Sequence, residues 1–216
     1  MSSTGPRGEI AALSDDRRDA YRQISALSRE PQDSELVLPL SVWERTSVRE
    51  QDSRETKLPT YRLHMLCDER GDYPAELNEW EADVLKTELQ RSGLVCWYRN
   101  PDRSTQDSLG VAYVDAGDIR MVRPDFLFFA EVGDGRIVVD IVDPHGVHLA
   151  DALLKLAGLA TYASRHAGVF RRICAVAEVG GKLRALELTR PDVKAAVIAA
   201  ESARSLYESA LASDFV

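Results

Sequence analysis

The chain has 216 residues, which suffices for one domain with an appended arm and excludes a complete ATP-driven motor or synthetase. A hydrophobic fraction of 44% and a charged fraction of 29% are typical of globular proteins and exclude a wholly disordered or collagen-like chain. The formal charge of -8 excludes a general attraction to nucleic acid or anionic lipid, so any binding of nucleic acid must use a local patch or a partner.

The cysteines predict a reducing compartment, and the hydropathy of the sequence predicts no membrane-spanning segment. Cys67, Cys96 and Cys174 are odd in number and far apart, so they predict neither a disulfide framework nor a metal-binding CxxC pair. The first residues lack the apolar core of a signal peptide, and no run of about 18 apolar residues occurs. We therefore expect a cytoplasmic protein with no membrane partner.

The N-terminal part predicts an arm of helical and strand segments followed by a linker. Ser14 can cap a helix that ends before Pro31, because apolar residues recur at helical spacing between them. Residues 35–40 and 60–66 alternate between apolar and polar side chains, as short strands do. The charged stretch 44–58 has no apolar periodicity and predicts a loop or linker.

We expect residues 1–70 to form this arm and linker, and residues 71–216 to form one α/β domain. The order of its elements predicts a mixed β-sheet flanked by helices. The predicted elements are a helix from Pro74 to about Gly93, strands over 94–98, 111–114 and 121–132, a strand over 137–142 joined to the last by a turn at Gly133, Asp134 and Gly135, a helix over 147–166, a hairpin over 173–179 and 182–188, and a helix from Pro191 to Leu211.

Two aspartates stand on the hairpin formed by residues 121–142. Asp125 enters one strand and Asp140 lies near the exit of its partner, so an antiparallel hairpin is expected to place them side by side. Two such carboxylates can bind a hard divalent cation, Mg²⁺ or Mn²⁺, that activates a water molecule against a phosphodiester. The alternative is that both side chains cap turns or face solvent.

This hairpin resembles the core of the PD-(D/E)XK nuclease superfamily, whose fold places a helix before a hairpin carrying Pro-Asp and then Asp/Glu-x-Lys, with another helix after it. Pro124-Asp125 matches the first half of the motif, and Asp140-Ile141-Val142 matches the second half except at its last position. The segments NEWE, CWYRNP, RPDFLFF, VDPHGVHLADALLKLAGLATYA and SARSLYESALASDF are similar to the C-terminal region of bacterial DEAD/DEAH-box helicases related to the Res subunit of type III restriction enzymes.

The resemblance covers nearly the whole chain. It implies a restriction-endonuclease-like core, DNA as the substrate and a helicase as a partner. The helicase motor itself is absent from this sequence, including its GxxxxGK[ST] phosphate loop, so the chain cannot hydrolyse ATP by that route.

The sequence departs from the superfamily pattern at the motif lysine. Val142 occupies the position where that lysine orients the attacking water and neutralises developing charge. Some members of the superfamily supply the lysine from the following helix, which implies Lys155 here; the alternative is a solvated helix lysine. The preceding helix often gives the metal an acidic residue, which implies Glu79, with Glu76 and Glu81 as competitors.

A second polar cluster follows the candidate strand. His148 and Asp151 are spaced to share a helix face, so a transition metal could be held by His145, His148 and either Asp143 or Asp151. The alternative is that these side chains cap the helix or bond to the backbone. Because the cluster lies beside the expected metal site, His145 and His148 are also candidate substrate-binding residues.

Basic residues gather between positions 164 and 190 and reverse the global charge locally. They could form a phosphate track in which Arg171 and Arg172 contact DNA, or they could serve only solubility. Trp97 and Tyr98 are expected to pack in the core rather than to stack on bases. The other arginines of this predicted track are Arg99, Arg103, Arg120 and Arg123.

Two hypotheses for function follow. The first is a metal-dependent DNA nuclease of the restriction or helicase-associated type, in which Asp125 and Asp140 hold Mg²⁺ or Mn²⁺, Glu79 assists and Lys155 replaces the motif lysine. The second is a catalytically lapsed nuclease-fold module that binds DNA or docks onto a helicase. The acidic pair favours the first hypothesis, whereas Val142 and the acidic net charge favour the second.

Overall fold

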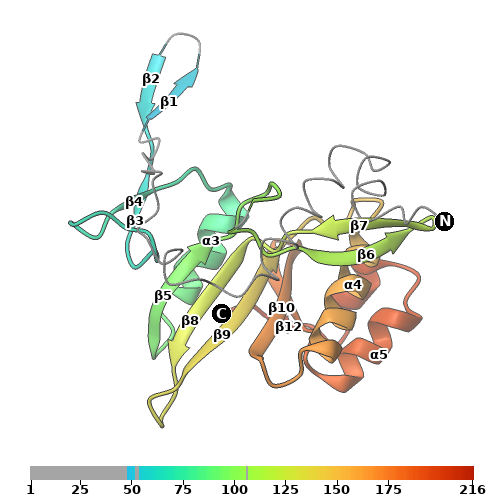
Figure 1. Cartoon of the computed structure of the whole chain (residues 1–216). Coiled ribbons are helices and arrows are strands. Elements are labelled where there is room, and N and C mark those ends of the chain that lie inside the picture. Colours follow the sequence, from blue (N-terminus) through green and yellow to red (C-terminus); the bar gives the residue numbers. More distant parts are fainter. Residues whose placement is uncertain (1–47, 52–53, 106) are drawn as a thin grey trace, which may run out of the picture. The chain divides into compact units, whose positions relative to one another are not determined.

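The computed structural model describes residues 48–51, 54–105 and 107–216 of the chain (Figure 1). The chain divides into two compact units, Met1–Arg45 and Thr46–Val216, and every described residue belongs to the second. The helix and the strand expected before residue 41 lie outside the described residues.

A six-stranded mixed sheet forms the body of the second unit (Figure 1). Neighbouring strands are antiparallel except β9 and β10, which are parallel and are connected through helix α4 (Ala152–Arg165), because a tight turn cannot join parallel strands. This arrangement confirms the predicted α/β fold with a mixed sheet flanked by helices. In spatial order the strands are β12 (Ser213–Asp214), β11 (Lys182–Glu187), β10 (Phe170–Val179), β9 (Ile137–Pro144), β8 (Phe126–Glu131) and β5 (Leu94–Arg99).

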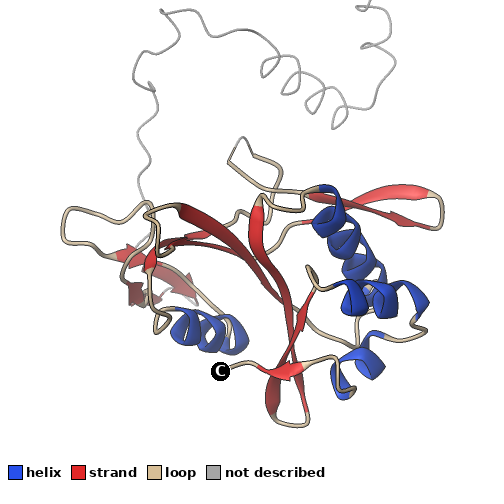
Figure 2. Cartoon of the chain, turned by 90° about the horizontal axis from the view of Figure 1, so that it is seen from below, coloured by secondary structure: helices blue, strands red, loops and turns tan. Residues whose placement is uncertain are grey.

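Helices cover both faces of the sheet, α3 on one face and three C-terminal helices on the other (Figure 2). The α3 face buries a cluster that includes Val84 and Leu85 of the helix and Phe126, Phe128 and Val142 of the sheet. The opposite face buries a larger cluster around α4. The helices are α3 (Glu79–Glu88), α4, α5 (Pro191–Ala199) and α6 (Ala203–Glu208).

Helix α3 begins later than the sequence predicts because a capping box fixes its first turn. The side chain of Asn78 accepts the backbone N–H of Glu81 at 2.9 Å, and the Glu81 carboxylate accepts the N–H of Asn78 at 3.0 Å. The capping box orients Glu81 from the start of the helix toward the edge strand β5, to which an ion pair joins it.

The predicted strand over 121–132 is two strands. Its first part belongs to a separate ribbon of β6 (Val111–Asp115) and β7 (Asp118–Val122), and its second part is β8 of the main sheet. Pro124 lies between them and has no N–H to continue a ladder. The ribbon packs on α4 at Gly158, where a Cβ atom would lie 2.7 Å from Cβ of Tyr113.

Three other predictions need correction. The charged stretch 44–58 contains an antiparallel hairpin rather than only a linker, and the helix predicted from Pro191 to Leu211 breaks at the extended Ala200. Only the first two residues of the strand predicted over 60–66 are a strand in the structure. The short strands of this region are β1 (Val48–Gln51), β2 (Arg54–Lys57), β3 (Thr60–Tyr61) and β4 (Tyr73–Pro74).

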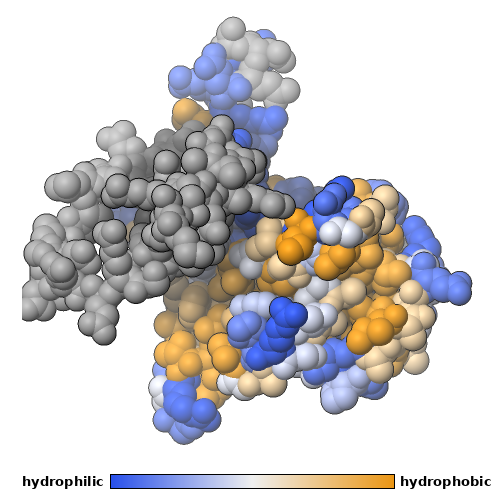
Figure 3. Space-filling view, turned by 45° about the vertical axis from the view of Figure 1, so that its right-hand side comes forward, coloured by the Kyte–Doolittle hydropathy of each residue, from blue (hydrophilic) through white to orange (hydrophobic). Residues whose placement is uncertain are grey.

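Apolar side chains are exposed on the face that carries the β6–β7 ribbon, α4 and α5 (Figure 3). They include Val114 and Ile119 of the ribbon and Ile198 of α5, each more than half exposed. Within the described ranges, no helix is both long enough and apolar enough to cross a membrane.

Candidate functional site

The β8–β9 register brings together Asp125 and Asp143, not Asp125 and Asp140. Phe126 pairs with Val142 at the start of the ladder, so the next position outward places Asp125 opposite Asp143. The backbone N–H of Asp125 donates to Oδ1 of Asp143 at 3.2 Å. The predicted neighbour Asp140 lies three residues earlier on β9, so that prediction was wrong.

Arg99 of β5 bridges the carboxylates at this end of the sheet. Its Nη1 lies 2.9 Å from Oδ1 of Asp125, and its Nη2 lies 2.9 Å from Oε1 of Glu81. The guanidinium also stacks over the ring of Phe126, 4.9 Å from the ring centre. We call the group Glu81, Arg99, Asp125, Asp143 and His145 the acidic site.

The helix carboxylate of this site is Glu81 and not the predicted Glu79. Glu79 is exposed in the first turn of α3, and no ion pair joins it to a described residue. Its other competitor, Glu76, is exposed and pairs with Arg49. The sequence could not choose among the three because the capping box at Asn78 sets where the helix starts, and this start leaves Glu76 before the helix and turns Glu81 toward Arg99.

Asp125 has an unusual protonation equilibrium. Its burial raises the pKa of the carboxyl to about 7, opposed by the positive charge of Arg99 and reinforced by the negative charges of Asp143 and Glu81. His145 makes a smaller opposing contribution. Asp125 therefore holds its proton to a higher pH in the folded protein than an ordinary aspartate does.

A partly buried histidine and a fully buried tyrosine extend the acidic site toward α6. Nδ1 of His145 lies 3.5 Å from Oδ2 of Asp143, and Nε2 lies 3.1 Å from the hydroxyl of Tyr207. Tyr207 is fully buried, and that burial raises its pKa well above 10, so its hydroxyl keeps its proton. Because Nδ1 of His145 faces acceptor oxygens of Asp143, the tautomer with the proton on Nδ1 leaves Nε2 to accept from the Tyr207 hydroxyl. His145 was predicted from the sequence to bind substrate, whereas nothing in the sequence indicated Tyr207.

Replacing Tyr207 with phenylalanine is expected to lower the free energy of unfolding by about 1 to 2 kcal/mol, because Nε2 of a buried histidine loses its donor. Urea denaturation followed by circular dichroism measures the change. Tyr162→Phe is the control, since the Tyr162 hydroxyl has no hydrogen bond to a described residue. Equal stabilities of the two variants would show that the Tyr207 hydroxyl does not hold His145.

Asp140 belongs to a separate buried ion-pair network. It lies opposite Phe128 with a side chain only 1% exposed, and its Oδ1 accepts Nε of Arg171 at 2.9 Å. Arg172 lies 3.3 Å from Oδ2 and also binds Glu88, a second carboxylate that is 1% exposed. Both oxygens of Asp140 are thus occupied by arginines, so the predicted metal-holding role of Asp140 is not supported.

Neither of the two positions considered for the motif lysine, Val142 and Lys155, lies at the acidic site. Val142 packs in the apolar cluster under α3, so a lysine at this position would enter the core rather than the acidic site. Lys155 pairs with Asp151 one turn earlier on α4 at 3.0 Å, and the Tyr113 hydroxyl donates to the same carboxylate at 3.1 Å. No described contact joins Lys155 to Asp125 or Asp140.

The acidic site does not fit a divalent cation as it stands. In the part of the chain that the structure describes, no three His, Cys, Asp or Glu side chains are grouped to hold a metal. Asp125 and Asp143 supply hard oxygen ligands, but Arg99 already places a cation against Asp125 and Glu81. Both ring nitrogens of His145 are turned to protein groups. The predicted Mg²⁺ or Mn²⁺ therefore has no complete ligand set here.

The predicted transition-metal cluster is also dispersed. His148 is exposed with its ring against Gly146, whereas Asp151 is held by Lys155 and Tyr113. His148 and the half-buried Arg123 have no ion pair with a described residue and remain candidates for contact with a ligand.

Ion pairs neutralise most of the predicted basic track. Lys182 and Arg184 both pair with Asp214, and Arg190 pairs with Asp192. Trp97 lies fully buried in the core, as expected from its strand setting. The basic stretch between residues 164 and 190 is thus not a continuous free surface.

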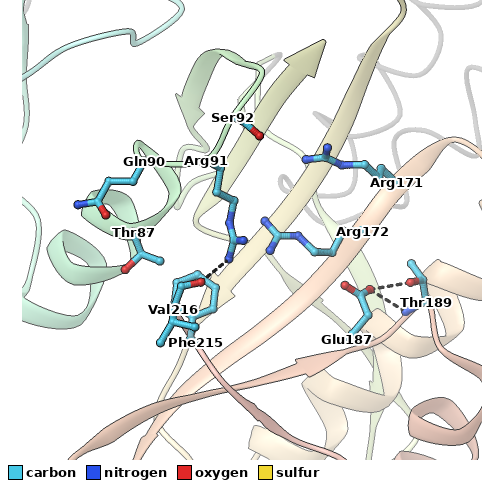
Figure 4. Close-up of a pocket in the computed structure, with 10 residues that line it drawn as sticks. All are labelled: Thr87, Gln90, Arg91, Ser92, Arg171, Arg172, Glu187, Thr189, Phe215 and Val216. Atoms are coloured by element: carbon cyan, nitrogen blue, oxygen red, sulfur yellow. Dashed lines mark hydrogen bonds between the residues drawn. The ribbon is translucent and has the colours of Figure 1, made fainter. Parts of the chain in front are cut away.

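Arginines do converge in a pocket at the C-terminal end of α3, opposite to the acidic site along the helix (Figure 4). Arg171 and Arg172 reach from β10 toward Arg91, which follows α3. The pocket is open to solvent and has a volume of about 940 Å³. We call it the arginine pocket, and its lining residues are Thr87, Gln90, Arg91, Ser92, Arg171, Arg172, Glu187, Thr189, Phe215 and Val216.

Comparison with known proteins identifies a family. The model of the YagJ family matches residues 62–216, which is most of the chain. The protein named "Protein YagJ" from Escherichia coli (strain K12) is 55% identical over 207 residues, covering 96% of this chain and 84% of that protein. No solved structure matches the chain significantly. The chain belongs to the YagJ family.

Proposed function

We propose that this chain is a nuclease-like protein that binds DNA at the acidic site without hydrolysing it. The observation that carries the proposal is the position of Arg99, whose guanidinium holds Asp125 and Glu81 where a nuclease would hold a metal ion. The guanidinium of Arg99 offsets part of the negative charge of Asp125 and Glu81 that would otherwise repel a phosphate backbone. The site is thereby suited to bind phosphates, and Arg99 occupies the carboxylate oxygens to which a water-activating metal ion would bind.

The surroundings of the acidic site support contact with phosphates. Arg123 precedes Pro124, and the side-chain amide of Asn100 holds Pro124 and Leu109 through their carbonyl oxygens at 2.8 and 2.9 Å. These bonds tie the two ends of the loop that carries the exposed Arg103 to Pro124, the residue after Arg123. Neither arginine has an ion pair with a described residue, so both are available to a phosphate.

The order of elements also supports a nuclease-like assignment. Helix α3 precedes the hairpin of β8 and β9, the hairpin starts with Pro124-Asp125, and α4 follows it. This is the order that the resemblance to the PD-(D/E)XK superfamily implies. The same resemblance implies a helicase partner and action on DNA rather than on a small substrate; the three free thiols agree with the proposed cytoplasmic location.

Metal-dependent hydrolysis is the second candidate, and one observation favours it. Asp143-Pro144-His145 stands opposite Asp125 as an Asp-x-His sequence, with His145 in the position that the superfamily gives to lysine. Hydrolysis by this route would require Arg99 to leave Asp125, because the ion pair and a metal ion compete for the same oxygen.

Plasmid nicking and DNA binding test the proposal together. We expect no nicking of supercoiled plasmid in Mg²⁺ or Mn²⁺, but binding of a fluorescein-labelled duplex that weakens about tenfold between 50 and 200 mM salt, as about two phosphate contacts require. The variant Arg103→Ala/Arg123→Ala should lower the salt slope by about 2. Arg136→Ala is the control, because Arg136 is an exposed arginine at the far turn of the same hairpin.

The outcomes separate the two candidates. Nicking in Mn²⁺ that Asp143→Asn abolishes would replace the proposed function with metal-dependent hydrolysis. Binding that is absent, or that responds equally to Arg136→Ala, would remove the acidic site as a DNA-binding surface.

A further inference from the structure

The arginine pocket lies outside the acidic site and is built around buried carboxylates. Arg91 binds Glu88 through Nε at 2.9 Å, Arg172 binds Glu88 at 2.7 Å, and Arg171 binds Asp140 at 2.9 Å. Glu88 and Asp140 are almost fully buried, whereas Arg91 and Arg171 are more than a third exposed. The carboxylates therefore act as anchors, and the guanidinium groups form the accessible layer.

Such anchoring prepares the arginines for a ligand. Arg171 uses Nε and Nη2 for Asp140, and its Nη1 has no hydrogen bond to a described residue. Nε of Arg172 is buried and likewise has no partner among the described residues. Because the side chains are already fixed, an anion that accepts the Nη1 N–H groups of the exposed Arg171 orders little that is mobile.

The remaining walls supply neutral donors and one apolar side. Thr87 and Ser92 bring hydroxyl groups and Gln90 brings an amide, while Phe215 forms an apolar wall that Arg91 covers at 5.6 Å. The acid in the wall, Glu187, is engaged in hydrogen bonds with the N–H of Ile173 and with Thr189. These hydrogen bonds stabilise the carboxylate of Glu187 within the wall of the pocket.

We propose that the arginine pocket binds a phosphate monoester carried by a ligand of about mononucleotide size. Three guanidinium groups stand against three carboxylates, those of Glu88, Asp140 and Glu187, so an anion would be held by the N–H groups that Arg91 and Arg171 expose to the pocket rather than by a surplus of charge. A monoester presents three free oxygens and up to two negative charges, so it uses several arginine forks at once, whereas a phosphodiester presents two oxygens and one charge. The volume of about 940 Å³ is in the range of pockets that take small ligands.

The monoester has two sources with the same chemistry, a free mononucleotide and the phosphorylated 5′ end of a DNA strand. Only the second source rests on the proposed function, because it requires that the chain binds DNA. The pocket and the acidic site lie at opposite ends of α3, so variants of one do not remove residues of the other.

Isothermal titration calorimetry of the full chain with adenosine 5′-monophosphate tests the pocket. We expect binding of the monophosphate and not of adenosine, and a loss of affinity of about tenfold or more in Arg91→Gln and in Arg171→Gln. Arg120→Gln is the matched control, since Arg120 is an exposed, ion-paired arginine on the β6–β7 ribbon. Circular dichroism verifies the fold of each variant, and Arg171→Gln carries the test if removal of the Glu88 partner unfolds Arg91→Gln.

A second titration compares the same oligodeoxynucleotide with a 5′-phosphate and with a 5′-hydroxyl. Tighter binding of the phosphorylated strand, lost in Arg171→Gln, identifies the strand end as the source. Binding of the mononucleotide without binding of either strand supports the pocket and overturns the proposed DNA binding. Failure of the monophosphate to bind, or binding that Arg91→Gln and Arg171→Gln leave unchanged, overturns the pocket proposal.

Discussion

Replacing Asp140 with alanine is expected to lower the free energy of unfolding by about 3 to 5 kcal/mol, the cost of breaking a buried ion pair from one side. Asp140 is 1% exposed and accepts from Arg171 and Arg172, the second of which is itself largely buried. Without Asp140, Arg172 keeps only Glu88, and part of its charge stays buried without compensation. Urea denaturation followed by circular dichroism measures the loss.

Two further variants, Arg171→Ala and Asp140→Asn, give free energies of unfolding with which the loss in Asp140→Ala is compared. Arg171→Ala is also expected to be costly, by about 2 to 4 kcal/mol, because it leaves the buried carboxylate of Asp140 with Arg172 at 3.3 Å as its remaining arginine partner. Asp140→Asn keeps the shape and one acceptor, so its cost should be smaller than that of Asp140→Ala. A loss below about 1 kcal/mol in Asp140→Ala would mean that Asp140 does not anchor the arginines.

The sequence predicts the order of elements well because apolar periodicity and turn residues are local signals. The strands at 94–98, 137–142 and 173–179 and the hairpin turn at Gly133 to Gly135 are all present in the structure. The long strand over 121–132 failed because apolar residues continue through two strands that belong to different sheets. Pro124 was the available signal for that break.

The candidate site depended on a quantity that the sequence does not contain, the register of the hairpin. The predicted strand end at Val142 put Asp140 near the exit of β9, but the strand continues to Pro144 and the exit carboxylate is Asp143. Because side chains alternate, this shift also moves Val142 from the expected catalytic position into the core.

The sequence pattern does not predict contacts between segments that are far apart in the chain. The sequence predicts Arg99 only as one arginine of the basic track. Its position between Asp125 and Glu81 depends on the pairing of β5 with β8. Tyr207 reaches His145 from α6 across 62 positions of the chain. Such contacts arise from tertiary packing, which periodicity and spacing do not encode.

Asp125→Asn is expected to make the protein less sensitive to alkaline pH. The folded pKa of Asp125 is raised to about 7, chiefly by burial, above its ordinary value of 3.8. Between these values the unfolded chain releases a proton that the folded chain keeps, so this group makes the wild type less stable as pH rises from about 4 to 7. The contribution of Asp125 to the free energy of unfolding is fully present below about pH 4 and is lost above about pH 7.

Asparagine does not titrate, so the variant should match the wild type near pH 4 and exceed its free energy of unfolding at pH 8, by on the order of 2 to 4 kcal/mol. Urea denaturation at pH 4, 6 and 8 measures the difference between the two curves. Asp134→Asn serves as a sign control, because hydrogen bonds from Arg136 lower the pKa of the exposed Asp134. The difference in free energy of unfolding between Asp134→Asn and the wild type should therefore change with pH in the opposite direction to that of Asp125→Asn.

Arg99→Ala extends the same argument to the proposed function. Removing the guanidinium leaves Asp125 among Asp143 and Glu81 with no compensating cation, so the pKa of Asp125 should rise further and the loss of stability at pH 8 should grow. Asp125→Asn in the Arg99→Ala background should restore most of that loss. If Arg99→Ala instead left the pH dependence unchanged, Arg99 would not be the cation that neutralises the acidic site, and the proposal that it replaces a metal ion would lose its physical basis.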